Sequence, residues 1–201
     1  MDPTRLFLRF IEMAELRPGH TVMDVTFQGS LFALQLLRLV EPQGKVVCVA
    51  FTPDHLERAR AEARSFGLAV EARLDWRLLT ASRFPFDDGQ FDVITCHGGF
   101  RFLNASRFFQ EAARVLAPGG RLVLSERLLR ATSFDPLFLK LRRLSYRYLW
   151  RNIEEAEATF HTADDLAEMA QAAGFRQIFI RGLERPRWGR LPVLSIVRAL
   201  K

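Results

Sequence analysis

Apolar positions along this chain follow two alternating patterns. Continuous apolar runs of strand length recur at 22–25, 45–51, 91–96 and 121–129. Around and between them, apolar residues recur every three or four positions at 4–16, 31–39, 53–67 and 105–116. The runs are typical of parallel strands buried on both faces, and the spaced positions predict amphipathic helices. A weaker strand is predicted at 69–74. This alternation indicates an α/β domain with a parallel sheet and right-handed crossovers.

The pattern changes in the last third of the chain. Residues 135–152 predict one long basic and aromatic helix. A shorter helix is predicted at 162–173, with Gly174 at its C-terminal end. Two apolar segments, 175–182 and 191–200, are predicted to pair as a hairpin of strands.

Composition bounds the class of protein. A chain of 201 residues that is 49% hydrophobic can build one sizeable core, so a single domain over 1–201 is expected. The chain has no apolar run of ~18 residues, and its first residues do not resemble a signal peptide. Cys48 and Cys96 lie in predicted strands, where they act as small core residues. A cytoplasmic protein is therefore expected.

Positive charge adds a second constraint. The net charge is +6, and only Lys45, Lys140 and Lys201 among the 29 basic residues are lysines. Arginine binds phosphates and carboxylates in a bidentate manner, so the excess is compatible with an anionic partner. A GC-rich or thermophilic genome that encodes arginine at most positively charged positions explains the same composition.

Three stretches carry a family resemblance. They are FPFDDGQFDVI at 84–94, FFQEAARVLAPGGRLVLSE at 108–126 and HTADDLAEMAQAAGF at 161–175. In this order they resemble the class I S-adenosylmethionine-dependent methyltransferases, in particular the small-molecule group of ubiquinone and menaquinone biosynthesis. The resemblance implies a seven-stranded Rossmann-like sheet of order 3-2-1-4-5-7-6 with a helical cap at about 135–160. It also implies S-adenosylmethionine as cofactor and a small-molecule substrate.

The predicted cofactor loop, TVMDVTFQGS at 21–30, departs from the family pattern D-x-G-x-G-x-G. Asp24 is kept, but Thr26, Gln28 and Ser30 occupy the glycine positions, and Gly29 is out of phase by one residue. Glycine lets a ligand approach the backbone, whereas side chains there occupy the space of the ligand. The loop also lacks the G-x-G-x-x-G pattern of dinucleotide-binding proteins.

Two acidic positions of the family pattern are also changed. The acid that accepts the ribose hydroxyls aligns with Ala50, beside Phe51, and the acid that holds the adenine aligns with Thr80, with Asp75 as the nearest acid. A lost charged acceptor and buried unpaired hydroxyls weaken binding by ~10²-fold or more.

The first hypothesis is therefore a methyltransferase-like protein whose cofactor binding is weak, atypical or lost. The alternative is an active methyltransferase of a small-molecule acceptor. A third is a non-catalytic or RNA-associated partner, although the N-P-P-Y motif of base methylation is absent.

His97 is the candidate catalytic residue. It follows Cys96 at the carboxyl end of the fourth predicted strand, where ligands bind in open α/β sheets. In the resembled family this region borders the transferred methyl group, so His97 could act as a general base, and Glu126 is a second candidate near the acceptor. The other interpretation is a structural histidine hydrogen-bonded to backbone. No further cysteine or histidine completes a metal site nearby.

The helix predicted at 135–152 has two different faces. One face carries Lys140, Arg143, Arg147 and Arg151, and the other carries Leu137, Leu141, Leu144 and Tyr148. Three interpretations remain: an apolar face that closes on the sheet with a solvated basic face, a basic lid for an anionic substrate, or a membrane-surface or nucleic-acid contact. A second basic segment comprises Arg185, Arg187, Trp188 and Arg190.

Overall fold

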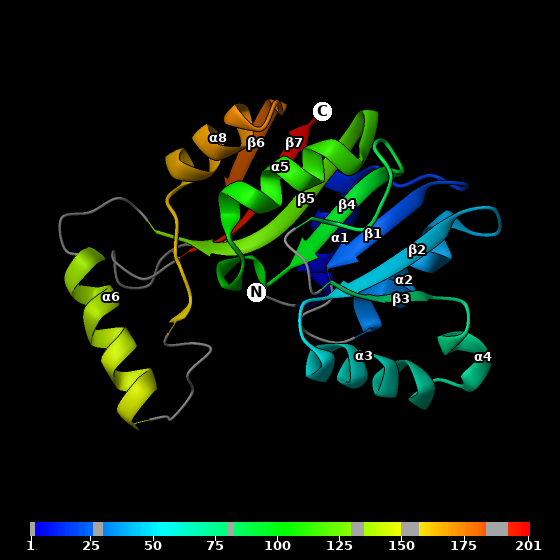
Figure 1. Cartoon of the computed structure of the whole chain (residues 1–201), viewed down its shortest axis with the longest axis horizontal. Coiled ribbons are helices and arrows are strands. Elements are labelled where there is room, and N and C mark those ends of the chain that lie inside the picture. Colours follow the sequence, from blue (N-terminus) through cyan, green and yellow to red (C-terminus); the bar gives the residue numbers. More distant parts are fainter. Residues whose placement is uncertain (1–2, 26–29, 80–82, 130–134, 150–156, 184–192) are drawn as a thin grey trace.

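The computed structural model describes residues 3–25, 30–79, 83–129, 135–149, 157–183 and 193–201 (Figure 1). Its centre is one seven-stranded sheet of order β3-β2-β1-β4-β5-β7-β6. The strands are β1 Thr21–Val25, β2 Lys45–Ala50, β3 Asp75–Leu78, β4 Phe91–His97, β5 Leu116–Leu128, β6 Arg176–Gly182 and β7 Val193–Leu200. Strands β1 to β5 pair in parallel, and β7 pairs antiparallel with both β5 and β6. The predicted strand order and terminal hairpin are confirmed.

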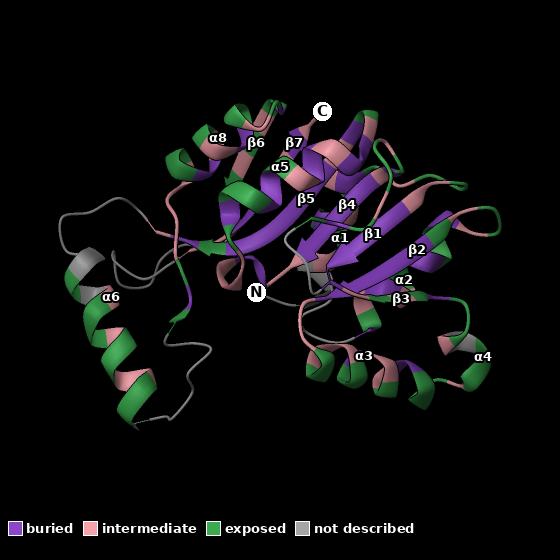
Figure 2. Cartoon of the chain, in the orientation of Figure 1, coloured by how far each residue is buried: buried purple, intermediate pink, exposed green. Residues whose placement is uncertain are grey.

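Helices cover both faces of the sheet. The helices of the described residues are α1 Pro3–Ala14, α2 Leu31–Val40, α3 Pro53–Ser65, α4 Leu68–Glu71, η1 Phe100–Phe102, α5 Ala105–Val115, α6 Asp135–Leu144, η2 Ser145–Leu149 and α8 Ala163–Ala172. One core cluster joins α5 and α8 to the sheet through Phe109 and Leu166. The other joins α1 and α2 to the opposite face through Phe10 and Leu36. The strands between these layers are mostly buried (Figure 2).

The third strand is not where the hydrophobic pattern placed it. The strand predicted at 69–74 is wrong: Leu68–Glu71 is the short helix α4, and β3 follows at Asp75–Leu78. Trp76 in β3 donates its indole N–H to the Glu71 carbonyl at 3.1 Å, which fixes the turn between the two elements. β3 is an edge strand whose residues alternate between exposed and half-buried, so it lacks the apolar run of a central strand.

The helix α5 matches its predicted position, but β5 begins directly after it at Leu116, earlier than the strand predicted at 121–129. The Asn104 side chain caps α5 by accepting the Arg107 N–H at 3.1 Å. The first part of β5 contains an irregular turn at Gly119, whose φ is +76°, where the register with β4 shifts. A Cβ at Gly120 would lie 2.8 Å from the Ala117 carbonyl oxygen, so this turn excludes larger residues.

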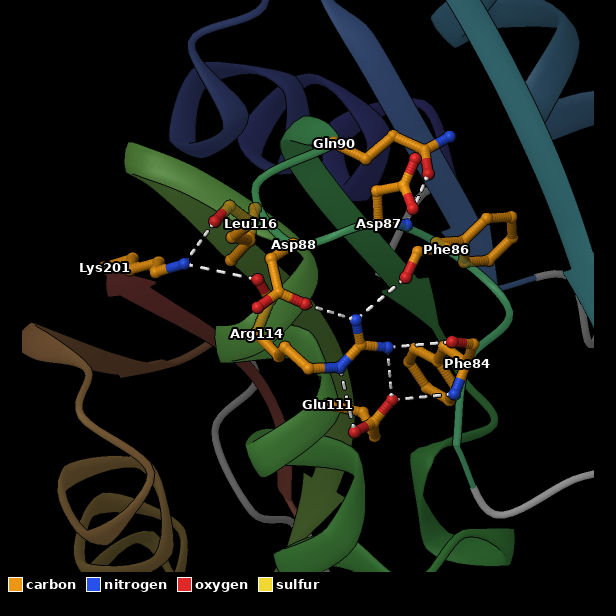
Figure 3. A network of polar contacts seen from close by, with 9 residues as sticks. All are labelled: Phe84, Phe86, Asp87, Asp88, Gln90, Glu111, Arg114, Leu116 and Lys201. Atoms are coloured by element: carbon orange, nitrogen blue, oxygen red, sulfur yellow. Dashed lines mark hydrogen bonds and ion pairs between the residues drawn. The ribbon is translucent and has the colours of Figure 1, made fainter.

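Arg114 ties the end of α5 to the loop that precedes β4 (Figure 3). Its guanidinium donates to the carbonyls of Phe84 and Phe86, each at 2.8 Å, and to the carboxylates of Asp88 at 2.7 Å and Glu111 at 2.8 Å. Glu111 also accepts the Phe84 N–H at 2.7 Å. The hydrogen bonds from Arg114 lower the pKa values of Asp88 and Glu111 below their usual range. Two sequence stretches of the family resemblance are thus joined by one side chain.

The helix predicted at 135–152 is shorter and differently placed. α6 ends at Leu144, the π-helix η2 follows at Ser145–Leu149, and residues 150–156, with Arg151, lie outside the described residues. The predicted closure of its apolar face on the sheet is wrong. The four apolar side chains of that face are between 53% and 70% exposed: Leu137, Leu141, Leu144 and Tyr148. Figure 1 shows α6 standing away from the sheet.

Both cysteines are buried, Cys48 in β2 and Cys96 in β4, as predicted. Burial raises the pKa of the Cys96 thiol, so this side chain stays protonated and unreactive. Over the part of the chain that the structure describes, no helix is both long enough and apolar enough to cross a membrane.

Candidate functional site

The candidate site lies along the carboxyl edge of the parallel strands β1, β4 and β5. These strands are neighbours, with Val25 opposite Cys96 and His97 opposite Ser125. Helix α2 begins at the same edge, at Leu31. In an open α/β sheet this edge is where ligands bind.

His97 makes a short side-chain contact with the neighbouring strand. Its Nδ1 lies 2.6 Å from the Oγ of Ser125, which is fully buried. The imidazole ring stacks on Phe32 of α2, with centroids 5.3 Å apart and planes 17° apart, and meets the edge of Phe10 at 6.3 Å. His97 therefore bonds a hydroxyl side chain, rather than the backbone partner that the structural interpretation predicted.

Burial lowers the pKa of His97, and the negative charge of Glu126 offsets part of this effect. The imidazole is accordingly neutral near pH 7. A neutral imidazole carries one N–H and one basic nitrogen. When Nδ1 donates to Ser125, the basic nitrogen is Nε2, so this arrangement can take a proton from a neighbouring group.

Glu126 and Arg101 form a buried ion pair beside His97. The Glu126 side chain is 3% exposed, and its carboxylate accepts the Arg101 guanidinium at 2.9 Å and the Arg101 N–H at 3.1 Å. Arg101 also donates to the Gly98 carbonyl at 3.0 Å. The pair fixes the short helix η1 against the end of β5, and so fixes the segment that follows His97.

Asp24, the retained acid of the loop pattern, faces β4. Its side chain is buried and accepts the hydroxyl of Thr95 at 2.6 Å. Because Thr95 and His97 are two residues apart on one strand, they project to the same face of the sheet. Asp24 therefore lies on the α1 and α2 side, as His97 does.

The first residue before α2 has a carboxylate partner from within the chain. Ser30 is fully buried, and its backbone N–H donates to Glu62 of α3 at 2.5 Å. The Ser30 hydroxyl lies 3.3 Å from the same carboxylate oxygen. Free N–H groups at a helix N-terminus attract anions. Here Glu62 already supplies the negative charge.

Ala50 ends β2, and its side chain is 1% exposed. Its carbonyl accepts the Leu79 N–H at 2.8 Å, which joins the end of β2 to the residue after β3. Phe51, the next residue, is half-buried and lies 6.3 Å from the ring of Phe84. A methyl group offers no acceptor for a sugar hydroxyl, so Ala50 does not supply the contact that the family pattern places there.

The remaining predicted cofactor residues, Thr26, Gln28, Gly29 and Thr80, lie outside the described residues. The same holds for the predicted basic segment with Arg185, Arg187, Trp188 and Arg190. Within the described ranges, no cluster of three histidine, cysteine, aspartate or glutamate side chains is arranged to hold a metal ion.

Sequence reasoning missed three residues of this edge: Ser125, Arg101 and Glu62. Ser125 could have been found from strand register, because parallel pairing of β4 with β5 places it opposite His97. Arg101 and Glu62 come from helices whose orientation no strand pattern specifies.

Known proteins match both the sequence and the fold of this chain. A family model described as a methyltransferase domain matches residues 24–124, from the end of β1 into β5. The chain belongs to the class I S-adenosylmethionine-dependent methyltransferase family. The family resemblance drawn from the three sequence stretches is thereby confirmed.

Two relatives that are similar in sequence to this chain are named as methyltransferases of quinone biosynthesis. The chain is 32% identical over 174 residues to the demethylmenaquinone methyltransferase of Deinococcus radiodurans, covering 77% of this chain and 67% of that protein. It is 30% identical over 194 residues to the ubiquinone/menaquinone biosynthesis C-methyltransferase UbiE of Pasteurella multocida, covering 87% and 69%.

A solved structure shares the fold at lower identity. The cyclase SpnF superposes with a TM-score of 0.76 at 20% identity, covering 98% of this chain and 80% of that one. A likeness at this identity establishes the fold alone. Because a cyclase has this fold, methyl transfer does not follow from the fold, and the site must decide the chemistry.

Proposed function

We propose that this chain is a small-molecule methyltransferase homologue of the quinone-biosynthesis type whose S-adenosylmethionine site is altered, so that cofactor binding is weak, atypical or lost. The observation that carries the proposal is Ala50. It ends β2 as a buried methyl group, where the family pattern has an acid that accepts both ribose hydroxyls. Losing that acceptor and leaving buried hydroxyls unpaired lowers affinity by ~10²-fold or more.

The start of α2 supports the same proposal. The Ser30 N–H already donates to Glu62, so a ligand at this helix end must compete with a carboxylate held 2.5 Å away. The Ser30 side chain also occupies one of the glycine positions of the family pattern, and Thr26 and Gln28 occupy the other two. The side chains at the glycine positions reduce the space for S-adenosylmethionine, and the Glu62 carboxylate reduces the positive potential at the N-terminus of α2.

Calorimetric titration with S-adenosylmethionine and with its demethylated product tests the proposal. We expect little heat and little increase in melting temperature at sub-millimolar ligand. A ligand present at about 100 times its Kd would instead stabilise the protein by about 2.7 kcal/mol. Clear binding at that concentration would contradict the altered-site proposal.

A repair variant tests the cause. The substitutions Thr26→Gly, Gln28→Gly, Ser30→Gly and Ala50→Asp together restore the family pattern, and we expect them to create measurable affinity. Ala50→Asp alone should restore less, because the three loop side chains remain. If both variants fold and neither binds, the altered positions are not the reason for weak binding.

A second candidate is an active methyltransferase of a small-molecule acceptor. The observation that favours it is the neutral imidazole of His97, held by Ser125 and Phe32 at the carboxyl edge of β4. In this role His97 accepts the proton that the acceptor loses, and S-adenosylmethionine supplies the methyl group when bound. Methyl transfer to a demethylated quinol by the wild-type protein, abolished by His97→Gln, would favour this candidate.

Replacement of Ser125 separates a base from a structural histidine. In an active enzyme, Ser125→Ala should shift the pH dependence of kcat/KM, because Ser125 sets the hydrogen bond of the imidazole. A change in stability with an unchanged pH profile would mean that the pair is structural.

A further inference from the structure

The outer surface of α6 and η2 combines an apolar row with a basic row. The apolar row comprises Leu137, Leu141, Leu144 and Tyr148, all more than half exposed. Spacings of four, three and four residues place them along one side of a helix. Isolated exposed leucines are common on protein surfaces, but a continuous row marks an interaction site.

The basic row lies directly beside the apolar row. Lys140, Arg143 and Arg147 are exposed and follow the same helical spacing. Arg147 lies 3.6 Å from Glu157, and both side chains are more than half exposed, so this pair is weak. The row is therefore a largely solvated set of cations bordering apolar side chains.

The opposite side of the helix attaches it to the chain. Arg142 places its guanidinium over the rings of Tyr146 at 4.5 Å and Phe160 at 4.6 Å. Phe160 belongs to the segment that leads into α8. The helical spacing thus places the attached side and the apolar row on different sides of the helix, and the apolar row remains exposed. Much of α6 is coloured as exposed in Figure 2.

We propose that the surface of α6 and η2 docks on an anionic lipid bilayer. The apolar row enters the boundary between headgroups and acyl chains, and the basic row contacts lipid phosphates, as in interfacial amphipathic helices. A nucleic acid would engage the cations but leave the leucines in water. At ten and five residues, α6 and η2 are too short to cross a hydrocarbon core of about 30 Å, so they lie on the bilayer. This proposal is independent of cofactor binding.

Vesicle sedimentation with the full chain tests the proposal. We expect binding to vesicles of phosphatidylcholine mixed with phosphatidylglycerol, and much weaker binding to phosphatidylcholine alone. High salt should reduce binding without abolishing it, because the apolar contact is not screened. No binding to the mixed vesicles at low salt would overturn the proposal.

Matched variants separate the two rows. Leu141→Gln with Leu144→Gln should weaken binding to mixed vesicles by at least about tenfold, because each leucine otherwise leaves water and glutamine adds no charge. Replacing Lys140, Arg143 and Arg147 by glutamine should weaken it by about fivefold for each charge. Leu68→Gln is the control, since Leu68 is 74% exposed on α4, and this substitution should leave vesicle binding within about twofold.

The leucine pair decides between lipid and a general polyanion. If the leucine variant binds mixed vesicles as well as the wild type does, the surface is an electrostatic site only, and bilayer docking is wrong. A competition experiment with an RNA oligonucleotide can lead to the same conclusion. This is the case if the RNA binds the wild type and the leucine variant with equal affinity and displaces vesicles from both proteins. All substituted side chains are exposed, so circular dichroism should confirm that the variants fold.

Discussion

Helices α5 and α6 carry similar sequence patterns and have opposite environments. Both place apolar residues at helical spacing, and each has at least one arginine in its last turn. In α5 the apolar residues Phe108, Phe109, Ala112 and Val115 are buried against the sheet. In α6 the corresponding row is exposed. A row of apolar residues at helical spacing therefore shows which face of a helix is apolar. It does not show whether other residues of the same chain bury that face.

The arginines of the two helices show the same difference. Arg114 of α5 is 18% exposed and bonds two backbone carbonyls and two carboxylates of its own chain. Arg143 of α6 and Arg147 of η2 are exposed. The α5 arginine stabilises the fold, whereas Arg143 and Arg147 present their charges largely to solvent.

Removal of an aromatic side chain from α5 should produce the largest loss of stability. Phe109 is fully buried and contacts the rings of Phe100 at 5.5 Å and Phe175 at 6.1 Å. Phe109→Ala should lower the free energy of unfolding by about 3–5 kcal/mol, because it leaves a cavity between α5 and its neighbours. Urea denaturation measures this loss. Tyr148→Ala in η2 is the control and should change stability by less than about 0.5 kcal/mol.

Loss of the Arg114 side chain should have the next largest effect. Arg114→Met keeps most of the aliphatic stem but leaves the Glu111 carboxylate and the carbonyls of Phe84 and Phe86 without their donor (Figure 3). We expect a loss of about 2–3 kcal/mol in urea denaturation. Arg114→Lys should recover only part of it, since an ammonium lacks the planar fork. Arg143→Met is the control. If Arg114→Met and Arg143→Met lower the free energy of unfolding equally, the hydrogen bonds of Arg114 contribute no more stability than an exposed arginine does.

Acid should weaken α5 through Glu111. The hydrogen bond from Arg114 lowers the pKa of Glu111 below its ordinary value, so the carboxylate stabilises the folded state above its unfolded pKa of about 4.3. That contribution is lost as pH falls through the lowered folded pKa. The stability difference between wild type and Glu111→Gln should therefore be about 1 kcal/mol near pH 6 and shrink toward pH 3. A constant difference across this range would exclude ionisation as its source.

The sequence predicted those parts of the fold that depend on continuous patterns. The central strands, the turn at Gly119 and the strand order followed from apolar runs and from the family resemblance. The edge strand β3 was misplaced because one side of the strand faces solvent and its residues resemble a loop. The environment of α6 was mispredicted because an amphipathic pattern states which face is apolar, and not what covers it.

The positions of two candidate site residues were predictable from the sequence, but their contacts were not. His97 and Asp24 lie at the predicted edge because strand ends can be counted along the chain. Their partners, Ser125 and Thr95, come from neighbouring strands and required the register of the sheet. The carboxylate of Glu62 at Ser30 required the path of α3, which no local pattern encodes.

The smallest effect on stability should come from the apolar row of α6. Leu141 is 59% exposed, so Leu141→Ala exchanges one exposed helix-forming residue for another. We expect a change in the free energy of unfolding within about 0.5 kcal/mol. Leu166→Ala is the matched control in α8, because Leu166 is fully buried and should lose about 2–5 kcal/mol.

Protein concentration sharpens this test. If Leu141→Ala costs more than about 2 kcal/mol, the leucine is packed in solution and α6 is no longer different from α5. A cost that grows with protein concentration would show that a second copy covers the row. A cost that is small at every concentration would mean that the row contributes nothing to folding. Its apolar surface would then be available for the bilayer.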